Sequence, residues 1–313
     1  MKLVTLTLNP AKDKTLEVGQ LTMNGLNIVL ESHQDPGGKG INVAKVAKTL
    51  CEPPLALGFL AGLTGQWIAS SLEALEVPHR MLKIEGETRT NTKIFCRSTK
   101  QITEINEQGT PISPHHLDQL FAQLKEVLTC GDILVLSGSV PPGVEISIYR
   151  TIIELANRLE CRCILDASGA LFKEGLKATP FMIKPNLHEI EQFLGHSINE
   201  EHEILTLCRE WHKSGIAHCF ISLGAQGGYY ANAEGIWKWK ALPVQAHSSV
   251  GAGDAFVAAV ATAFLRGLDS EALLKLAVAT SAGAVVSQGT KSASLTWINA
   301  QIPNVVLQWL GKL

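Results

Sequence analysis

The sequence is short of charge and lacks the marks of several protein classes. Of its 313 residues, 18% are charged, below the roughly 25% usual for soluble domains. The net charge is −2 and there is no block of Lys and Arg, so we do not expect nucleic acid as a partner. No apolar run reaches the roughly 18 residues of a membrane span, and the N-terminus lacks a signal-peptide pattern. These absences favour a cytoplasmic protein without a membrane segment, and a hydrophobic content of 46% predicts a large core.

Metal and redox patterns are also missing. The seven cysteines contain no Cys-x-x-Cys pair, and the ten histidines contain no His-Glu-x-x-His pattern. We therefore expect reduced, mostly buried thiols. Two phosphate-binding fingerprints are incomplete as well. Gly251-Ala252-Gly253 is followed by Phe256 where a dinucleotide motif needs a third glycine, and Gly40 stands where a Walker loop needs Ser or Thr. The sequence is therefore neither an evident Rossmann dehydrogenase nor a P-loop NTPase.

The chain does contain a glycine turn that leads into an apolar helix. Ser249-Val250-Gly251-Ala252-Gly253-Asp254 is followed by the proline-free, apolar run Ala255–Leu265. Glycines let backbone N–H groups converge on one point, and a helix N-terminus adds unpaired donors and a positive dipole end. The turn therefore predicts an anion site. Asp254 could merely stabilise the helix, or it could be a general base beside a bound phosphate. At a helix start its pKa is expected to be low.

A second glycine turn lies near the N-terminus. Pro36-Gly37-Gly38-Lys39-Gly40-Ile41-Asn42 precedes a helix whose apolar residues Val43, Val46, Ala47 and Leu50 have helical spacing. The turn could be only a tight connection. However, glycines around one lysine leave the backbone open to a ligand, and Asn42 can both donate and accept hydrogen bonds. We favour the ligand-binding interpretation.

The order of the remaining elements predicts a parallel α/β architecture. Expected strands are Lys2–Leu8, Leu55–Leu60, Ile133–Leu136, Cys163–Leu165, Phe181–Ile183 and Phe220–Leu223, and expected helices include Gln66–Leu75, Ser113–Leu128 and Ile146–Leu159. Several strands end in small or polar residues, and ligands of open α/β sheets bind at those ends. Asp13, after the first strand, could be a turn former or a ligand group. Asn186 with Glu189 three residues later is a helix-capping pattern, which alone could explain both residues.

Two polar regions predict a smaller, separate sheet. Residues 15–35 alternate weakly, and Glu87–Cys96 and Gln101–Asn106 have polar side chains at alternate positions. A small sheet that interrupts an α/β core is a plausible lid. Within it, Arg89 could be a surface charge or could bind a phosphate. Arg89, Asn91 and Lys93 would share one face, since alternate residues of a strand do.

Taken in order, the motifs resemble those of the PfkB (ribokinase-like) carbohydrate kinases. The similarity covers residue 3 to about residue 290 and is strongest to the branch of 1-phosphofructokinase and tagatose-6-phosphate kinase. It is carried by Asn9-Pro10-x-x-Asp13, Gly37-Gly38-Lys39-Gly40-x-Asn42, Thr88-Arg89-x-Asn91-x-Lys93, Leu136-Ser137-Gly138-Ser139, Asp166-x-Ser168-Gly169, Lys184-Pro185-Asn186-x-x-Glu189, Ser222-Leu223-Gly224-x-x-Gly227 and Val250-Gly251-Ala252-Gly253-Asp254. The resemblance implies one kinase domain over residues 1–313, built on a doubly wound, mostly parallel sheet flanked by helices. A small β-sheet lid, inserted at about 12–35 and 87–107, would also form a homodimer contact.

The resemblance also implies roles for individual residues, with ATP as donor and Mg²⁺ as metal. Asp254 matches the catalytic base, and Gly251, Ala252 and Gly253 match the anion hole. Sugar-binding positions match Asp13, Gly38, Lys39, Asn42, Arg89 and Asn91, with Arg89 where phosphosugar kinases bind the existing phosphate. Nucleotide-binding positions match Lys184, Ser222, Gly224, Gly227, Ser281 and Ser287, while Asn186 and Glu189 match the motif that orders magnesium and the phosphates.

The motifs leave the acceptor open. Fructose 1-phosphate, converted to fructose 1,6-bisphosphate, is the leading expectation, and tagatose 6-phosphate or fructose 6-phosphate is the nearest alternative. Ala255-Phe256 and Ile28 depart from the phosphosugar branch, which keeps an unphosphorylated sugar or a nucleoside open. A non-catalytic sugar-phosphate sensor on a kinase fold is the alternative from outside the enzymes.

Overall fold

The structure is a computed structural model that describes residues 1–245, 250–287 and 289–313. Ten strands form one large sheet in the order β14-β13-β12-β11-β10-β9-β8-β1-β4-β5. They are β1 (Leu3–Thr7), β4 (Leu55–Ala61), β5 (His79–Ile84), β8 (Ile133–Ser137), β9 (Arg162–Asp166), β10 (Met182–Ile183), β11 (His218–Ser222), β12 (Gly228–Asn232), β13 (Gly235–Trp239) and β14 (Leu307–Gly311). Neighbours from β11 to β5 are parallel and the β12, β13 and β14 pairings are antiparallel. The predicted doubly wound, mostly parallel sheet is confirmed.

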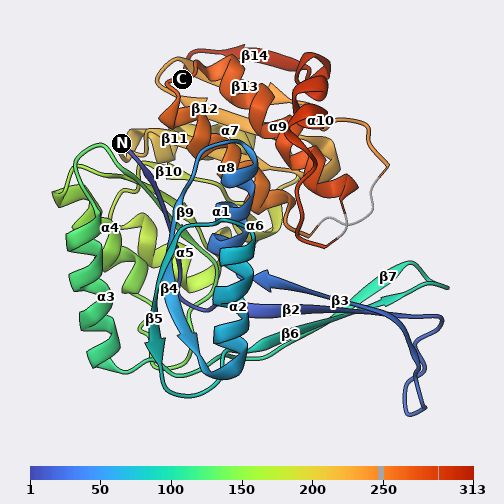
Figure 1. Ribbon diagram of the computed structural model, residues 1–313. Coiled ribbons are helices and arrows are strands. Elements are labelled where there is room, and N and C mark those ends of the chain that lie inside the picture. Colours follow the sequence, from blue (N-terminus) through green and yellow to red (C-terminus); the bar gives the residue numbers. More distant parts are fainter. Residues whose placement is uncertain (246–249, 288) are drawn as a thin grey trace.

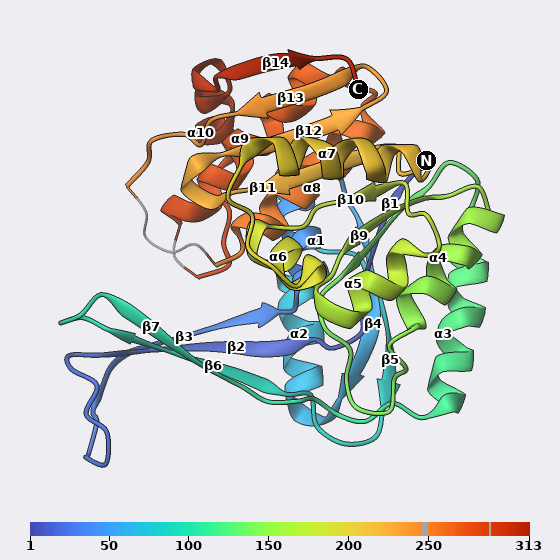
Figure 2. The same cartoon turned by 180° about the vertical axis from the view of Figure 1, so that it is seen from behind.

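Helices cover both faces of this sheet (Figures 1 and 2). They are α1 (Lys39–Thr49), α2 (Gly62–Ala74), α3 (Pro114–Val127), α4 (Ile148–Arg158), α5 (Gly169–Leu176), α6 (Leu187–Leu194), α7 (Glu201–Lys213), α8 (Ala252–Leu265), α9 (Ser270–Val286) and α10 (Leu295–Gln301), with short 3₁₀ turns at Gly224–Gln226 and Ile302–Asn304. Helices α3 to α7 share one hydrophobic core with the sheet, and α1, α8, α9 and α10 share another. No helix among the described residues is both long and apolar enough to cross a bilayer.

Strand β8 shows why the central strands are continuously apolar. Leu134 and Leu136 belong to the core under α3 to α7, whereas Ile133 and Val135 belong to the core under α1, α8 and α9. Successive side chains of a strand point to opposite faces, so a strand covered on both sides needs apolar residues at every position. Helix α8 is likewise buried almost all round, from Asp254 to Phe264, and packs against both α1 and α9.

A separate four-stranded sheet, here called the small sheet, projects from the main body (Figures 1 and 2). It consists of β2 (Ala11–Val18), β3 (Val29–Gly37), β6 (Thr90–Cys96) and β7 (Gln101–Asn106), in the order β3-β2-β6-β7. The predicted polar strands thus do pair apart from the core. Strand β3 extends to Gly37 and α1 begins at Lys39, so most of the expected turn, Pro36–Asn42, is strand or helix. Pro36 is tolerated there because β3 is an edge strand, where a missing N–H costs no ladder bond.

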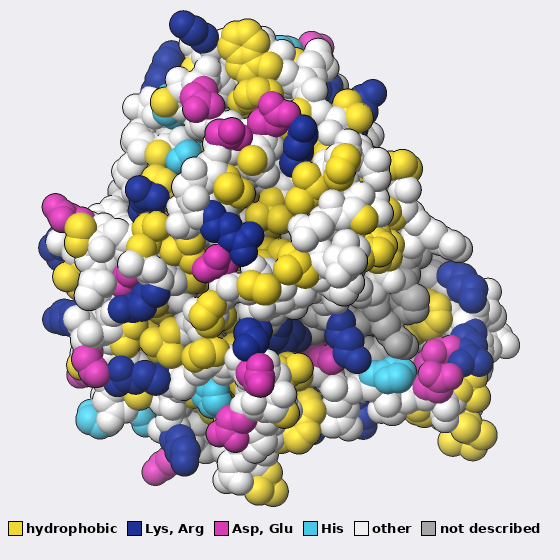
Figure 3. Space-filling view, turned by 45° about the horizontal axis from the view of Figure 1, so that its top comes forward, with side chains coloured by type: hydrophobic (Ala, Val, Ile, Leu, Met, Phe, Trp, Pro, Cys, Tyr) yellow, Lys and Arg dark blue, Asp and Glu magenta, His cyan; other side chains and the backbone are white. Residues whose placement is uncertain are grey.

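Other boundaries also differ from the sequence-based expectations. Helix α2 begins at Gly62, four residues before the expected Gln66, and β5 was not predicted. The β5 strand is an edge strand of partly exposed residues, so it lacks the apolar pattern of the central strands. On the face shown in Figure 3, side chains of both charges and hydrophobic side chains are interspersed without a continuous region of one charge, in agreement with the small net charge.

Candidate active site

A cavity of about 820 Å³ lies where several parallel strands end. The ends of β1, β8, β9, β10 and β11, the starts of α1 and α8, and residues of the small sheet line it. This is the edge at which open α/β sheets bind ligands, and the volume is large enough for two small molecules. Seventeen predicted site residues line it: Asp13, Gly38, Lys39, Asn42, Arg89, Asn91, Lys184, Asn186, Glu189, Ser222, Gly224, Gly227, Gly251, Ala252, Gly253, Asp254 and Ser281.

The glycine turn, Gly251–Gly253, opens helix α8 at one wall of the cavity. Gly251 has φ of 80°, a left-handed conformation that favours glycine. Within the described ranges no side chain caps the helix start, which leaves its first N–H groups available to a ligand. A Cβ atom on Gly253 would lie 3.5 Å from Lys184 Nζ, which places an ammonium group beside the turn. Ser249, the first residue of the predicted motif, lies outside the described residues.

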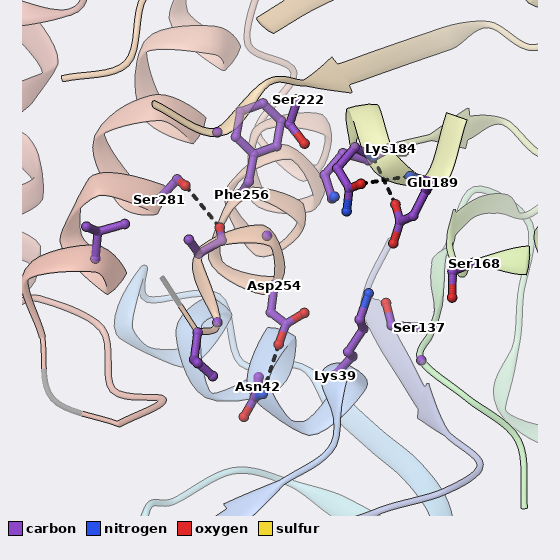
Figure 4. A pocket seen from close by; sticks show the side chains of 18 of the residues that line it. Lys39, Asn42, Ser137, Ser168, Lys184, Glu189, Ser222, Asp254, Phe256 and Ser281 are labelled. Carbon is purple, nitrogen blue, oxygen red and sulfur yellow. Dashed lines mark hydrogen bonds between the residues drawn. The ribbon is translucent and has the colours of Figure 1, made fainter. Parts of the chain in front are cut away.

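Asp254 is buried at this helix start, with 6% of its surface exposed. Asn42 Nδ2 donates a hydrogen bond of 2.8 Å to Asp254 Oδ2 (Figure 4). Burial raises the pKa of Asp254 to about 6, although the charge of Lys39 opposes the shift. The expected low pKa is therefore wrong, because removal from water outweighs the helix dipole and the neighbouring lysines. A carboxylate with this pKa is ionised at neutral pH and still able to accept a proton.

Two lysines at the cavity are held by one buried carboxylate that sequence reasoning left without a role. Asp166 Oδ2 lies 3.3 Å from Lys39 Nζ, and Asp166 Oδ1 lies 3.2 Å from Lys184 Nζ. Asp166 is 1% exposed. Burial acts to raise its pKa, but Lys184 and Lys39 together outweigh burial and hold it below the usual range. Its place at the end of β9, in Asp166-x-Ser168-Gly169, was the available signal. Asp166 therefore fixes two ammonium groups at the same end of the cavity.

Asn186 and Glu189 form the predicted capping box of α6. Glu189 N donates to Asn186 Oδ1 and Asn186 N donates to Glu189 Oε2, each at 2.9 Å. Helix capping thus uses one oxygen of each side chain. The second carboxylate oxygen of Glu189 takes no part in the capping box. Both Asn186 and Glu189 line the cavity. No group of three or more His, Cys, Asp and Glu side chains suited to a metal ion occurs among the described residues.

The small sheet contributes a polar wall. Asn91 Nδ2 donates to Asp13 Oδ1 at 3.2 Å, and Lys93 Nζ lies 3.5 Å from Asp13 Oδ2. Arg89, Asn91 and Lys93 all line the cavity, as their alternate spacing predicted. Three further polar atoms, Asn42 Oδ1, Asn91 Oδ1 and Ser137 Oγ, are buried without a hydrogen-bond partner in the described part of the chain. Asn91 belongs to the small sheet, Asn42 to α1 and Ser137 to the end of β8. Since such atoms are normally paired, this part of the cavity suits a ligand with several hydroxyl groups.

Arg89 is anchored at the rim of the cavity. Its guanidinium donates to the carbonyl oxygens of Asn9 and Glu107 at 2.9 Å and to that of Pro10 at 3.4 Å. Burial lowers the pKa of Arg89, against the charges of Asp13 and Glu107. These contacts are to neutral oxygens and use three of the five N–H groups of the guanidinium. The positive charge and two donors therefore remain for an anion, and Arg89 is not simply a solvated charge.

The opposite part of the cavity is apolar. Its lining side chains are Trp239, Leu242, Val244, Phe256, Val278, Ala282 and Val285. Ser281 lines it too, but its hydroxyl donates to the Ala252 carbonyl at 3.0 Å (Figure 4). Ser287 does not line the cavity. Its hydroxyl donates to the Gly283 carbonyl at 2.7 Å, an ordinary bond to the preceding helical turn. The shape fits a ligand with a flat apolar group at one end and anionic groups at the glycine turn.

Comparisons with known proteins agree with this geometry. The pattern of the pfkB family carbohydrate kinases matches residues 7–297. The chain is 34% identical to 1-phosphofructokinase of Borreliella burgdorferi over 88% of this chain and 89% of that protein. It is 32% identical to tagatose-6-phosphate kinase of Staphylococcus epidermidis, with the same coverage. Among solved structures, the tetrameric inhibited form of phosphofructokinase-2 from Escherichia coli is similar with a TM-score of 0.90 and 27% identity, over 97% of this chain and 98% of that one.

Proposed function

The chain belongs to the pfkB family of carbohydrate kinases, and we propose that it transfers the γ-phosphoryl group of ATP to fructose 1-phosphate, yielding fructose 1,6-bisphosphate. The observation that supports this is the arrangement along the cavity. Asp254, the glycine turn and the lysines held by Asp166 stand at one end. The polar wall of the small sheet continues to Arg89, whose guanidinium donates hydrogen bonds to three carbonyl oxygens. A base, an anion site and a second, remote cation are the groups that phosphorylation of a sugar phosphate requires.

In the proposed reaction, a sugar hydroxyl oxygen attacks the γ-phosphorus in line. The bond from the γ-phosphorus to the β–γ bridging oxygen breaks, and ADP leaves with that electron pair. Asp254 takes the hydroxyl proton as the new bond forms. Backbone N–H groups of the glycine turn stabilise the charge on the transferred group without having to reorganise. Asn42 keeps the Asp254 carboxylate oriented toward the acceptor.

The residues present fit a magnesium ion bound together with the phosphates. Mg²⁺ usually keeps several waters and uses one or two carboxylates plus the substrate phosphates. Glu189, 9% exposed and lining the cavity, retains one carboxylate oxygen outside the capping box. Asn186 and Glu189 would thus order the ion indirectly, and the ion would neutralise phosphate charge.

Tagatose 6-phosphate is the second candidate acceptor, because a tagatose-6-phosphate kinase is almost as similar to this chain as a 1-phosphofructokinase. The similarity to kinases argues against a non-catalytic sugar-phosphate sensor.

An assay of ADP release separates the alternative acceptors. It is run with fructose 1-phosphate, tagatose 6-phosphate, fructose 6-phosphate, fructose and a nucleoside. We expect the highest kcat/KM for fructose 1-phosphate. A higher value for an unphosphorylated acceptor would overturn the proposal.

We further propose that the small sheet acts as a lid over the sugar within a single kinase domain. Its strands carry Asp13, Asn91 and Lys93 into the cavity, while much of β3 and all of β7 are exposed. Sugar phosphate should therefore slow amide hydrogen exchange in residues 11–37 and 90–106, because the bound sugar orders these strands and excludes water. Strand β4, in the core, serves as the internal control. Unchanged exchange in both segments would rule out a lid.

The small sheet also suits a contact with a second copy of the chain. Ile28, Val29, Leu30, Ile102 and Ile105 in and beside it are between 41% and 71% exposed, an apolar surface of the kind that marks interfaces. We expect a homodimer, so sedimentation should give about twice the chain mass, and Ile105→Glu should shift it toward the monomer. A monomeric wild-type protein would contradict this.

We assign the protein to the cytoplasm, in keeping with its free cysteines.

A further inference from the structure

Helix α1 carries three polar side chains that contact distant parts of the chain, and only two of them, Lys39 and Asn42, line the cavity and have a role in the proposed reaction. Lys39 meets Asp166, Asn42 meets Asp254, and Lys45 meets Thr290. Residues three apart are neighbours on one side of a helix, so the three form a row that runs from the cavity to the region behind the glycine turn. Lys45 does not line the cavity and no sequence motif drew attention to it.

The ammonium of Lys45 joins two segments far apart in the chain. Lys45 Nζ donates to the Pro36 carbonyl at 2.9 Å and to Thr290 Oγ1 at 2.7 Å. Pro36 belongs to the last residues of β3, where the small sheet joins the body of the protein. Thr290 is buried, and its Cα lies 3.8 Å from the position of a Cβ on Gly251. Thr290 therefore stands directly behind the glycine turn, and Lys45 bridges it to the base of the small sheet.

The same two segments also meet without Lys45. A Cβ on Gly289 would lie 2.7 Å from Asp35 Oδ2, and a Cβ on Gly37 would lie 2.6 Å from the Asp13 carboxylate. The end of β3 is thus packed between a sugar-facing residue on one side and the segment behind the glycine turn on the other. Because interiors are close-packed, a shift of one segment has to displace its neighbours.

The charge of Lys45 is not matched by a contacting carboxylate among the described residues. Burial lowers the pKa of Lys45 to about 8; the nearby Asp35, Asp13 and Asp254 act against this shift and Lys93 adds to it. Lys45 is partly buried, and a cation that is withdrawn from water and held by neutral oxygens costs stability. An apolar side chain of equal length would avoid that cost but could not hold both oxygens. The cost is understandable if the geometry that Lys45 imposes is needed for function.

We propose that Lys45 is a positioning residue for phosphoryl transfer, which holds the glycine turn at a set place relative to the base of the small sheet. This inference rests on the proposed function, because the turn is taken to stabilise the transferred group. In-line transfer requires that the hydroxyl of the acceptor under the small sheet points at the phosphorus bound at the glycine turn. A small displacement of either group lowers the rate strongly. Lys45 would provide that alignment without touching either substrate.

The test compares Lys45→Met with Lys48→Met. Both residues lie on α1, but Lys48 is paired on the surface with Glu76 at 3.0 Å, so Lys48→Met controls for the loss of a lysine from this helix. In Lys45→Met we expect kcat to fall by about tenfold or more while KM for the sugar phosphate changes by less than about threefold, the pattern of a lost transition-state effect. A higher KM with unchanged kcat would overturn the proposal, because Lys45 would then act on binding alone.

Hydrogen exchange without any substrate tests the link separately from the reaction. In Lys45→Met, exchange should be about tenfold faster both in residues 250–256 and in residues 31–38, and unchanged in β4. Thr290→Val removes the same contact from the other side and should give the same pattern if Lys45→Met does not fold. Unaltered exchange at the glycine turn in a folded variant would refute the link. Failure of the proposed function would instead appear as a wild-type protein that phosphorylates no sugar phosphate, whatever the exchange shows.

Discussion

Replacing Asp254 by Asn is expected to lower kcat by about 10²–10⁴-fold and to leave KM for both substrates within a few-fold, the usual effect of losing a general base. The amide has nearly the same shape and can still accept the hydrogen bond from Asn42. It cannot take a proton from the acceptor hydroxyl. Steady-state kinetics at saturating ATP and sugar phosphate measures both quantities. If Asp254→Asn retains most of its turnover, another group is the base.

A stability measurement separates lost chemistry from a lost fold. The pKa of Asp254 is about 6 in the folded protein and about 3.9 in an unfolded chain. The folded state therefore loses stability as the pH rises from about 4 through 6, and this penalty persists at neutral pH. Asn carries no charge, so Asp254→Asn should be at least as stable as the wild type at pH 7. Asp118→Asn, on the exposed side of α3, is the matched control and should alter neither property.

The pH dependence of the wild type is an independent check on the same carboxylate. Because Asp254 must be ionised to accept a proton, kcat/KM should fall about tenfold per pH unit below about pH 6. The residual activity of Asp254→Asn should not show this fall of kcat/KM at acid pH. An acid limb that begins near pH 4 would mean that burial does not raise the pKa of the catalytic group.

Arg89→Ala is expected to raise KM for the sugar phosphate by about ten- to several-hundred-fold, with a much smaller effect on kcat. A hydrogen bond to a charged group contributes about 1.5–3 kcal/mol, and the three bonds from Arg89 to carbonyl oxygens of the described residues use three of its five N–H groups. The remote phosphate is held similarly before and during transfer, so the loss appears in KM. A lysine cannot reproduce the two parallel bonds, so Arg89→Lys should recover little.

The contacts of Arg89 demand a control for structure. Its guanidinium also fixes the carbonyl groups of Asn9, Pro10 and Glu107, and their release could disturb the base of the small sheet. Activity toward unphosphorylated fructose distinguishes the two effects, since it should barely change if Arg89 binds the phosphate. Arg97→Ala removes an arginine that is paired with Glu17 and Glu31 on the same sheet. This variant should change neither the activity toward fructose nor the activity toward fructose 1-phosphate. Equal losses for fructose and fructose 1-phosphate would assign Arg89 to structure.

The sequence by itself determined the layout of the protein. Continuous apolar strands such as Ile133–Leu136 require helices on both faces, and a polar alternation such as Gln101–Asn106 requires a sheet outside the core. Glycine turns before helices located two parts of the cavity lining, at the starts of α1 and α8. These features are local: each depends on the period of side chains along one segment or on the conformational freedom of glycine. Ser287 was assigned to the nucleotide through the family resemblance and not through such a local pattern; it directly follows α9 and is not among the residues that line the cavity.

The tertiary structure decided the charges and partners within that layout. Asn42 and Asp254 are 212 residues apart in the chain, and Lys39 and Asp166 are 127 apart, so no local pattern reveals that they touch. Burial raises the pKa of Asp254. Lys184 and Lys39, from different parts of the chain, lower the pKa of Asp166. Three carbonyl oxygens hold the guanidinium of Arg89 in place. Electrostatic energies depend on distance in space and on exclusion of water. Both quantities exist only once the chain has folded.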